Sequence, residues 1–201
     1  MESSVKSRVS ELLAEIHKLE DELEDAIRTH EVDFLYRIDG TRIRFERAVE
    51  ETHRKLKVGL LRWLGDASLR NLASAPFIYA MILPFALLDA FVSTYQAICF
   101  PLYRIPKVPR SRYIVIDRHQ LSYVNAIEKL NCVYCGYING LIAYVREISA
   151  RTEQYWCPIK HARKVLDPHR RYARFADFGD SEGFQNHVAR MRESLRNHSE
   201  A

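Results

Sequence analysis

The sequence predicts a mainly α-helical chain with a membrane segment, and three observations support this class. Residues 73–103 contain a single formal charge, Asp89, and a nearly uncharged run beyond about 18 residues is typical of a helix embedded in a bilayer. The N-terminal residues repeat apolar side chains at helical spacing, and the 201 residues include only seven glycines. We predict an N-terminal amphipathic helical hairpin (1–66), a membrane segment (73–103), a cytoplasmic helical Cys/His domain (111–165) and a polar basic tail (166–201).

The N-terminal region carries a heptad pattern in which apolar residues recur at alternating spacings of four and three. Its members are Val5, Val9, Leu12, Ile16, Leu19, Leu23 and Ala26. Such a seam is typical of a coiled-coil helix. A second apolar periodicity follows Gly40, so we predict an antiparallel helical hairpin, residues 4–36 against 41–64. We expect these helices to bind a protein partner or a second copy of the chain.

Two other patterns overlap the second predicted helix. Apolar residues alternate around Asp39-Gly40, at Tyr36, Ile38, Ile43 and Phe45, which is the pattern of a β-hairpin with a two-residue turn. Glu50-x-x-His53 has the spacing of metal ligands in di-iron helix bundles. A single such pair beside Arg54 and Lys55 is more typical of a solvated helix face.

Pro84 divides the membrane segment and leaves two arrangements open. A single helix over Phe77–Cys99 would extend about 34 Å, enough to cross a bilayer with some tilt. A re-entrant hairpin bent at Pro84 would instead return both basic flanks to the anionic cytoplasmic leaflet. Because a carboxylate is costly in hydrocarbon, we expect Asp89 to face a partner, a second copy of the chain, or Ser93 and Thr94 one turn away.

The net charge of +4 and the pI near 8.9 reflect basic residues that gather beside the apolar segment. Attraction to anionic lipid accounts for this placement, so the expected partner is the lipid bilayer and not nucleic acid. The N-terminus lacks the apolar core of a secretory signal. We therefore expect the bulk of the chain on the cytoplasmic side of the membrane.

Most of the chemically capable residues lie in the Cys/His domain, which we predict to contain helices over 118–130 and 138–155. Cys132-x2-Cys135 and Cys157-x3-His161 supply the ligand types of a Cys3His zinc site, with iron as the alternative metal. One unbroken helix over 138–155 would rise about 27 Å and separate the pairs. A single site therefore requires a broken helix, a chain that doubles back or a second protomer. Two separate sites, and buried cysteines without metal, stay open.

Additional ligands and another chemistry are consistent with this region. Asp117 and His119 would lie near Cys157 and His161 if the two helices packed antiparallel, although Asp117 also suits a helix N-cap. Cys132-x2-Cys135 at a helix start could instead exchange disulfides, but no βαβ pattern surrounds it. The tail is polar, and we predict a short helix over 181–197.

The runs LNCVYCGYINGLIAYVREISARTEQYWCPIKHAR and APFIYAMILPFALLDAFVSTYQAICFPLY resemble a family of uncharacterised bacterial membrane-associated proteins. The resemblance covers about residues 70–165. It implies a bacterial origin and the coherence of this segment, and it transfers no activity, cofactor or catalytic residue. From this resemblance together with the apolar segment, we expect the chain at a bacterial inner membrane.

Two function classes follow from these patterns. The first is a membrane-anchored interaction or assembly protein with a small Cys/His module that zinc could stabilise. The second is a membrane-bound metal- or thiol-dependent redox enzyme. The chain has no phosphate-binding glycine loop and no nucleophile elbow, so the first class is favoured and the question of catalysis stays open.

Overall fold

A computed structural model of the chain forms two compact units, which are described separately. The first comprises the described residues up to Gly59 together with Gln120–Asn125, and the second comprises Leu60–His119 and the chain from Ala126 onward. The residues that the structure describes are 15, 18–19, 22–23, 25–26, 36–39, 42–45, 47–66 and 68–197.

The first unit contains a β-hairpin where we predicted the junction of two helices. Strands β1 (Tyr36–Asp39) and β2 (Arg42–Phe45) pair antiparallel, with Tyr36 opposite Phe45 and Asp39 opposite Arg42. The helical prediction for 41–64 was therefore wrong at its start, and the alternative hairpin is confirmed. Alternation of apolar residues around Asp-Gly outweighs the helical periodicity that resumes on both sides.

Helices follow the hairpin, and some residues before the hairpin are helical as well. α2 (Arg47–Lys55) belongs to the first unit, and α3 (Leu60–Gly65) begins the second. Most of the predicted helix 4–36 lies outside the described residues. The described residues between 15 and 26 are helical, and Leu19 and Leu23 are exposed, so the coiled coil stays a prediction.

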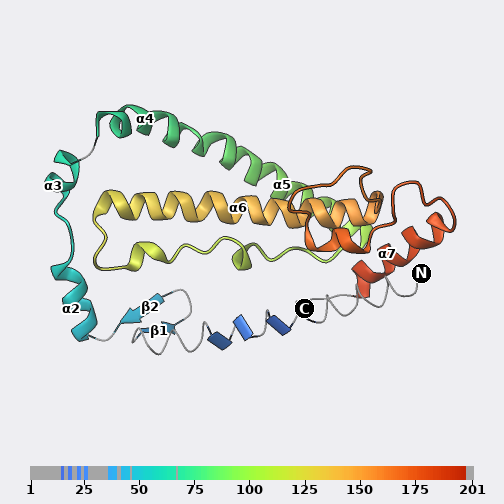
Figure 1. Cartoon of the computed structure of the whole chain (residues 1–201), viewed down its shortest axis with the longest axis horizontal. Coiled ribbons are helices and arrows are strands. Elements are labelled where there is room, and N and C mark those ends of the chain that lie inside the picture. The colour runs from blue at the N-terminus through green and yellow to red at the C-terminus, as the bar shows by residue number, and fades with distance from the viewer. Residues whose placement is uncertain are drawn as a thin grey trace. The chain divides into compact units, whose positions relative to one another are not determined.

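The predicted membrane segment forms two nearly continuous helices, α4 (Leu69–Ala80) and α5 (Ile82–Tyr103). Ser68 caps α4 by accepting a hydrogen bond from the amide of Asn71 at 3.4 Å. The chain passes Pro84 without turning back (Figure 1), because Pro84 lies in the first turn of α5, where proline is tolerated. A single helical run therefore replaces the re-entrant hairpin.

α6 (Ala126–Trp156) is a single helix of 31 residues, which corrects the two helices predicted over 118–130 and 138–155. Gly136 and Gly140 do not break it. A Cβ at Gly140 would lie 2.5 Å from the carbonyl oxygen of Tyr113 and 2.7 Å from Cα of Ile114. These glycines allow the extended segment 113–116 to approach the helix closely.

α5, the return segment 104–119 and α6 form the centre of the second unit. After α5 ends at Tyr103, the return segment runs back along α6 and includes the short 3-10 helix η1 (Arg110–Arg112) (Figure 1). η2 (Arg118–Gln120) follows. α5 and α6 consequently run parallel. The core between them consists of Phe100, Ile105, Val108, Leu141, Tyr144 and Ile148.

The region predicted as a polar tail folds against the C-terminal half of α6. It contains the 3-10 helix η3 (Arg170–Arg174) and α7 (Phe184–Asn197). α7 corresponds to the predicted helix 181–197 and begins three residues later. Val188 and Leu195 of α7 are buried. The segment is thus part of the second unit.

Candidate functional site

α5 has its polar side chains turned toward the protein and its apolar side chains turned outward, which is the inverse of a helix in a water-soluble protein. Its polar residues Asp89, Ser93 and Gln96 lie on the face toward α6 and the return segment, and Gln96 is only 6% exposed. The opposite side is apolar, with Phe91 73% exposed. The exposed large apolar side chains of α4 and α5 that point away from this polar side, called here the outward face, are Leu69, Leu72, Phe77, Leu83, Leu87, Leu88, Phe91, Ile98 and Leu102.

The carboxylate of Asp89 is neutralised within its own chain. Nη2 of Arg110 lies 2.7 Å from Oδ2, and the Tyr137 hydroxyl donates to the same oxygen at 3.0 Å. Ser93 donates to Oδ1 at 3.1 Å, which was one of the alternatives left open, whereas Thr94 donates to the carbonyl oxygen of Ala90 at 2.8 Å. Sequence reasoning missed Arg110 and Tyr137, because nothing local connects α5 with residues 21 and 48 positions away.

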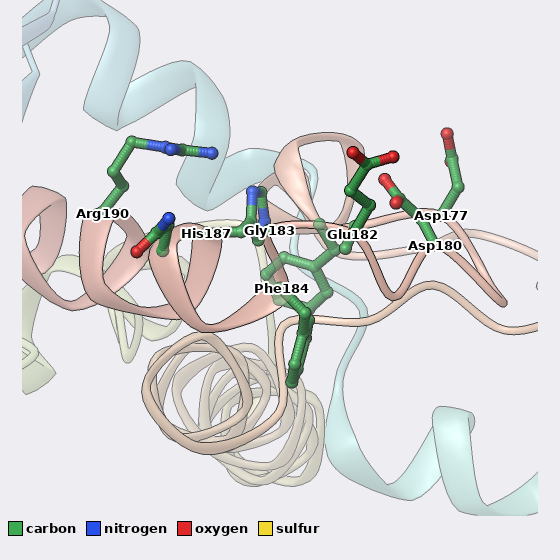
Figure 2. Close-up of a pocket in the computed structure, with 10 residues that line it drawn as sticks. Asp177, Asp180, Glu182, Gly183, Phe184, His187 and Arg190 are labelled. Atoms are coloured by element: carbon green, nitrogen blue, oxygen red, sulfur yellow. The ribbon is translucent and has the colours of Figure 1, made fainter.

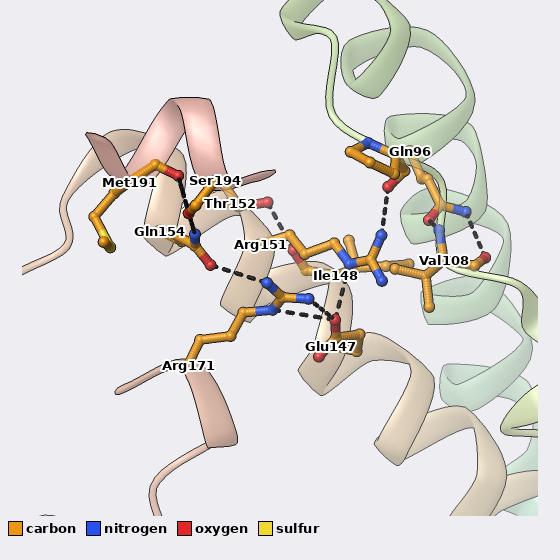
Figure 3. Close-up of polar contacts among 11 residues, drawn as sticks. Gln96, Val108, Glu147, Ile148, Arg151, Thr152, Gln154, Arg171, Met191 and Ser194 are labelled. Carbon is orange, nitrogen blue, oxygen red and sulfur yellow. Dashed lines mark hydrogen bonds and ion pairs between the residues drawn. The ribbon is translucent and has the colours of Figure 1, made fainter. Parts of the chain in front are cut away.

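Gln96 fastens the return segment to the inward side of α5. Its side-chain oxygen accepts from the amide of Val108 at 2.6 Å, and its side-chain nitrogen donates to the Tyr144 hydroxyl at 2.8 Å. Figure 3 shows Gln96 beside Val108. The polar residues 89, 93 and 96 share one helical face at i, i+4 and i+7, a sequence pattern that could have predicted this buried side.

A second polar cluster joins α6 to η3, α7 and the return segment (Figure 3). Oε1 of Glu147 accepts from Arg171 at 2.6 Å and from Arg151 at 2.8 Å. Arg151 also donates to the carbonyl oxygen of Pro106 at 2.7 Å. Nη1 of Arg171 donates to the side-chain oxygen of Gln154 at 2.9 Å. We call these four side chains, Glu147, Arg151, Gln154 and Arg171, the α6 clasp.

The electrostatics of the α6 clasp are those of a structural ion-pair network. Burial by itself would raise the pKa of Glu147, but hydrogen bonds from Arg171 and Arg151 outweigh it and hold the pKa below its ordinary value. Gln154 extends the network by donating to the carbonyl oxygen of Met191 at 3.0 Å. The clasp therefore holds α7 and the return segment on the same helix.

The predicted zinc ligands do not come together within one chain. Cys132 and Cys135 lie within α6, whereas Cys157 directly follows its end, and the helix rises about 36 Å between Cys132 and Trp156. One zinc ion binds all its ligands at about 2.0–2.3 Å. The four predicted ligands therefore cannot bind one zinc ion within a single chain. Among the described residues, no group of three or more potential ligands could hold a metal.

The additional predicted ligands are separated from Cys157 for the same reason. Asp117 lies in the return segment just past Val115, which contacts Gly136 on the N-terminal half of α6, and His119 follows in η2. The predicted packing of 118–130 against 138–155 does not exist because α6 is unbroken. Zinc or iron binding by other combinations of these residues stays a prediction.

His161 contacts aromatic and backbone groups at the far end of α6. Its ring stacks on Tyr172 with a centroid separation of 6.2 Å, and its backbone amide donates to the Tyr172 hydroxyl at 2.7 Å. Glu50 and His53 are also explained structurally. Glu50 pairs with Arg54 at 3.3 Å, while the His53 ring packs edge-on against Phe45 and Tyr123.

A hollow of about 290 Å³ lies beside the start of α7 (Figure 2). Asp177, Asp180 and Glu182 lie on one side, and His187 and Arg190 lie on the other. Nζ of Lys160 pairs with Asp177 at 2.8 Å. Because the acidic and the basic side chains lie on separate sides of the hollow, the outward face of α4 and α5 is the stronger candidate for a functional surface.

Comparison with known families, curated proteins and solved structures gives no match for this chain. The resemblance to bacterial membrane-associated proteins stays a prediction. Within the described residues, Leu69–Tyr103 is the one helical stretch long and apolar enough to cross a membrane.

Proposed function

We propose that this chain is a membrane-attached interaction or assembly protein. The inverted pattern of α5 carries the proposal: Asp89 and Gln96 are bonded inside the protein, while Leu83 and Phe91 are 68% and 73% exposed. A protein surrounded by water buries its apolar side chains first, and a large contiguous apolar surface is typical of a membrane or protein contact.

The rest of the chain suits an interaction role at the membrane. The α6 clasp and the core between α5 and α6 hold the second unit together beside the outward face. In the first unit, Leu19 and Leu23 are helical and exposed, which supports partner binding or self-association through the predicted coiled coil. We further propose that the protein acts at the cytoplasmic side of a bacterial inner membrane.

The redox alternative has less support. A Cys-x2-Cys pair is activated by the amide groups at a helix start. Cys132 is instead the seventh residue of α6, well inside the helix. Cys135 and Cys157 are exposed, which keeps metal or thiol chemistry as a second candidate that metal analysis and thiol titration of the purified protein will test.

The membrane proposal is tested by flotation of the purified full chain with phospholipid vesicles. The variant Leu87→Lys/Phe91→Lys changes only the outward face, so we expect vesicle binding to weaken at least about tenfold with unchanged helicity. The matched control, Gln185→Lys/Ala189→Lys, adds the same charge on exposed positions of α7 and should bind normally. Equal binding by both variants would contradict the proposal.

A further inference from the structure

The orientation of α5 in a membrane determines where two other segments lie. α5 and α6 run parallel, because Asp89 contacts Tyr137, whereas Tyr95 and Gln96, about two turns later in α5, contact Thr152 and Tyr144, which also lie later in α6. The return segment is fastened to α5 through Val108. If α5 crossed a bilayer, α6 and the return segment would cross beside it.

A crossing orientation would place an exposed charge at the middle of the bilayer. Asp89 lies near the centre of the apolar stretch 73–103. Its partner Arg110 has a side chain that is 48% exposed, and the neighbouring Arg112 is exposed as well. An arginine open to hydrocarbon at this depth is strongly unfavourable.

The return segment itself is unsuited to hydrocarbon. Its residues 114–117 form neither helix nor strand, and Val115 is exposed. Non-helical backbone is tolerated at membrane depth only where protein covers it or where it lines a water-filled cavity. This segment therefore belongs on the aqueous side.

The outward face has the geometry of a helix that lies along a membrane. Leu83, Leu87 and Phe91 follow one another every fourth residue and continue to Ile98 and Leu102, which forms one apolar stripe. The helical run of 35 residues extends about 52 Å, well beyond the roughly 30 Å of the hydrocarbon core. An in-plane orientation accommodates this length without a steep tilt.

The charges identify the lipid class. Exposed Arg70 and Arg104 lie at opposite ends of the helical run. Residues 60–119 carry seven Lys/Arg against three Asp/Glu. With the helical run in the membrane plane, both ends reach the headgroups of the same leaflet, where basic residues attract anionic phospholipids.

We infer that α4 and α5 lie in the plane of a single leaflet, with the outward face among the acyl chains of anionic phospholipids and α6 on the aqueous side. This inference rests on the proposed membrane attachment and specifies its geometry. It replaces a crossing helix with a one-sided, interfacial one.

Depth measurements distinguish the two geometries. In a Trp63→Phe/Trp156→Phe background, single tryptophans at Leu83, Phe91 and Leu102 are bound to vesicles of phosphatidylcholine and phosphatidylglycerol that carry bromine at known acyl positions. We expect equal, shallow depths at the three positions. A crossing helix would separate Leu83 from Leu102 by about 29 Å along its axis, so unequal depths would overturn the inference. A tryptophan at Gln185 of α7 is the unquenched control.

The unmodified protein provides an independent measurement if the tryptophan background does not fold. Because α5 and α6 are parallel, polarised infrared spectra in oriented bilayers report their common direction. We expect amide I dichroism of helices in the membrane plane, and dichroism of helices along the membrane normal would overturn the inference. Failure to bind vesicles at all, with a dimer in sedimentation, would instead overturn the membrane proposal and assign the outward face to a second copy of the chain.

Discussion

Arg110 and Asp89 form an ion pair at 2.7 Å across 21 residues of sequence, and this pair joins the return segment to the inward side of α5. The Asp89 side chain is only 15% exposed. Hydrogen bonds from Arg110, Tyr137 and Ser93 therefore replace water in stabilising its negative charge.

Removal of the arginine should destabilise the second unit. We expect Arg110→Ala to reduce the free energy of unfolding by about 1–3 kcal/mol, because a mostly buried carboxylate loses its charged partner. Lys107→Ala, at an exposed position of the same segment, is the control and should have little effect. In a double-mutant cycle, Asp89→Asn should remove most of the penalty of Arg110→Ala, and strict additivity would contradict the pairing.

Gly140→Ala should also be destabilising, although alanine in a helix interior is more favourable than glycine by about 1 kcal/mol. The new methyl group would meet backbone atoms of Tyr113 and Ile114 at 2.5 and 2.7 Å. We expect a net loss of about 1–3 kcal/mol in urea unfolding. Gly136→Ala should cost less, because its nearest contact is 3.2 Å. The reverse order would contradict the close approach.

The α6 clasp should make stability sensitive to acid. The folded-state pKa of Glu147 lies below its ordinary value of 4.5, so the ionised carboxylate contributes stability above that pH. This contribution is lost as the pH falls from 4.5 through the lower folded-state pKa. Glu147→Gln should be less stable at pH 7 and show a smaller decrease on acidification. Thermal melting between pH 7 and pH 3 measures both, and parallel profiles would contradict the assignment.

The two pairs of potential metal ligands should behave independently. The length of α6 separates Cys132 and Cys135 from Cys157 and His161. We therefore expect Cys132→Ser to leave any metal bound near Cys157 unchanged, and Cys157→Ser to leave any metal near Cys132 unchanged. Metal content per chain by elemental analysis is the measurement. Loss of one full equivalent from each single variant would indicate a site shared between two protomers.

Several features were predictable because they depend on neighbouring residues. The apolar stretch 73–103, the helix near 181–197 and the contact of Ser93 with Asp89 follow from local spacing. The β-hairpin was visible as an alternative, but two periodicities competed over the same residues. Local pattern alone does not decide between them, because packing determines which one buries its apolar side.

We also predicted an interruption in the region of α6, and this prediction was wrong for a different reason. Gly136 and Gly140 have a low intrinsic helix propensity, so the sequence suggested a loop. In the folded chain the missing side chains make room for Tyr113 and Ile114. Packing against the return segment thus compensates for the low helix propensity of the two glycines. The resulting unbroken helix separates Cys132 and Cys135 from Cys157.

By itself, the sequence determined that the chain is mainly helical and that one long segment is apolar, since both depend on residue types a few positions apart. Only the tertiary structure decided that Asp89 pairs with Arg110 and Tyr137, and that Cys132 lies far from Cys157. These features depend on contacts between residues tens of positions apart. Side-chain reach, close backbone approach and shared burial determine them, and sequence spacing does not record these quantities.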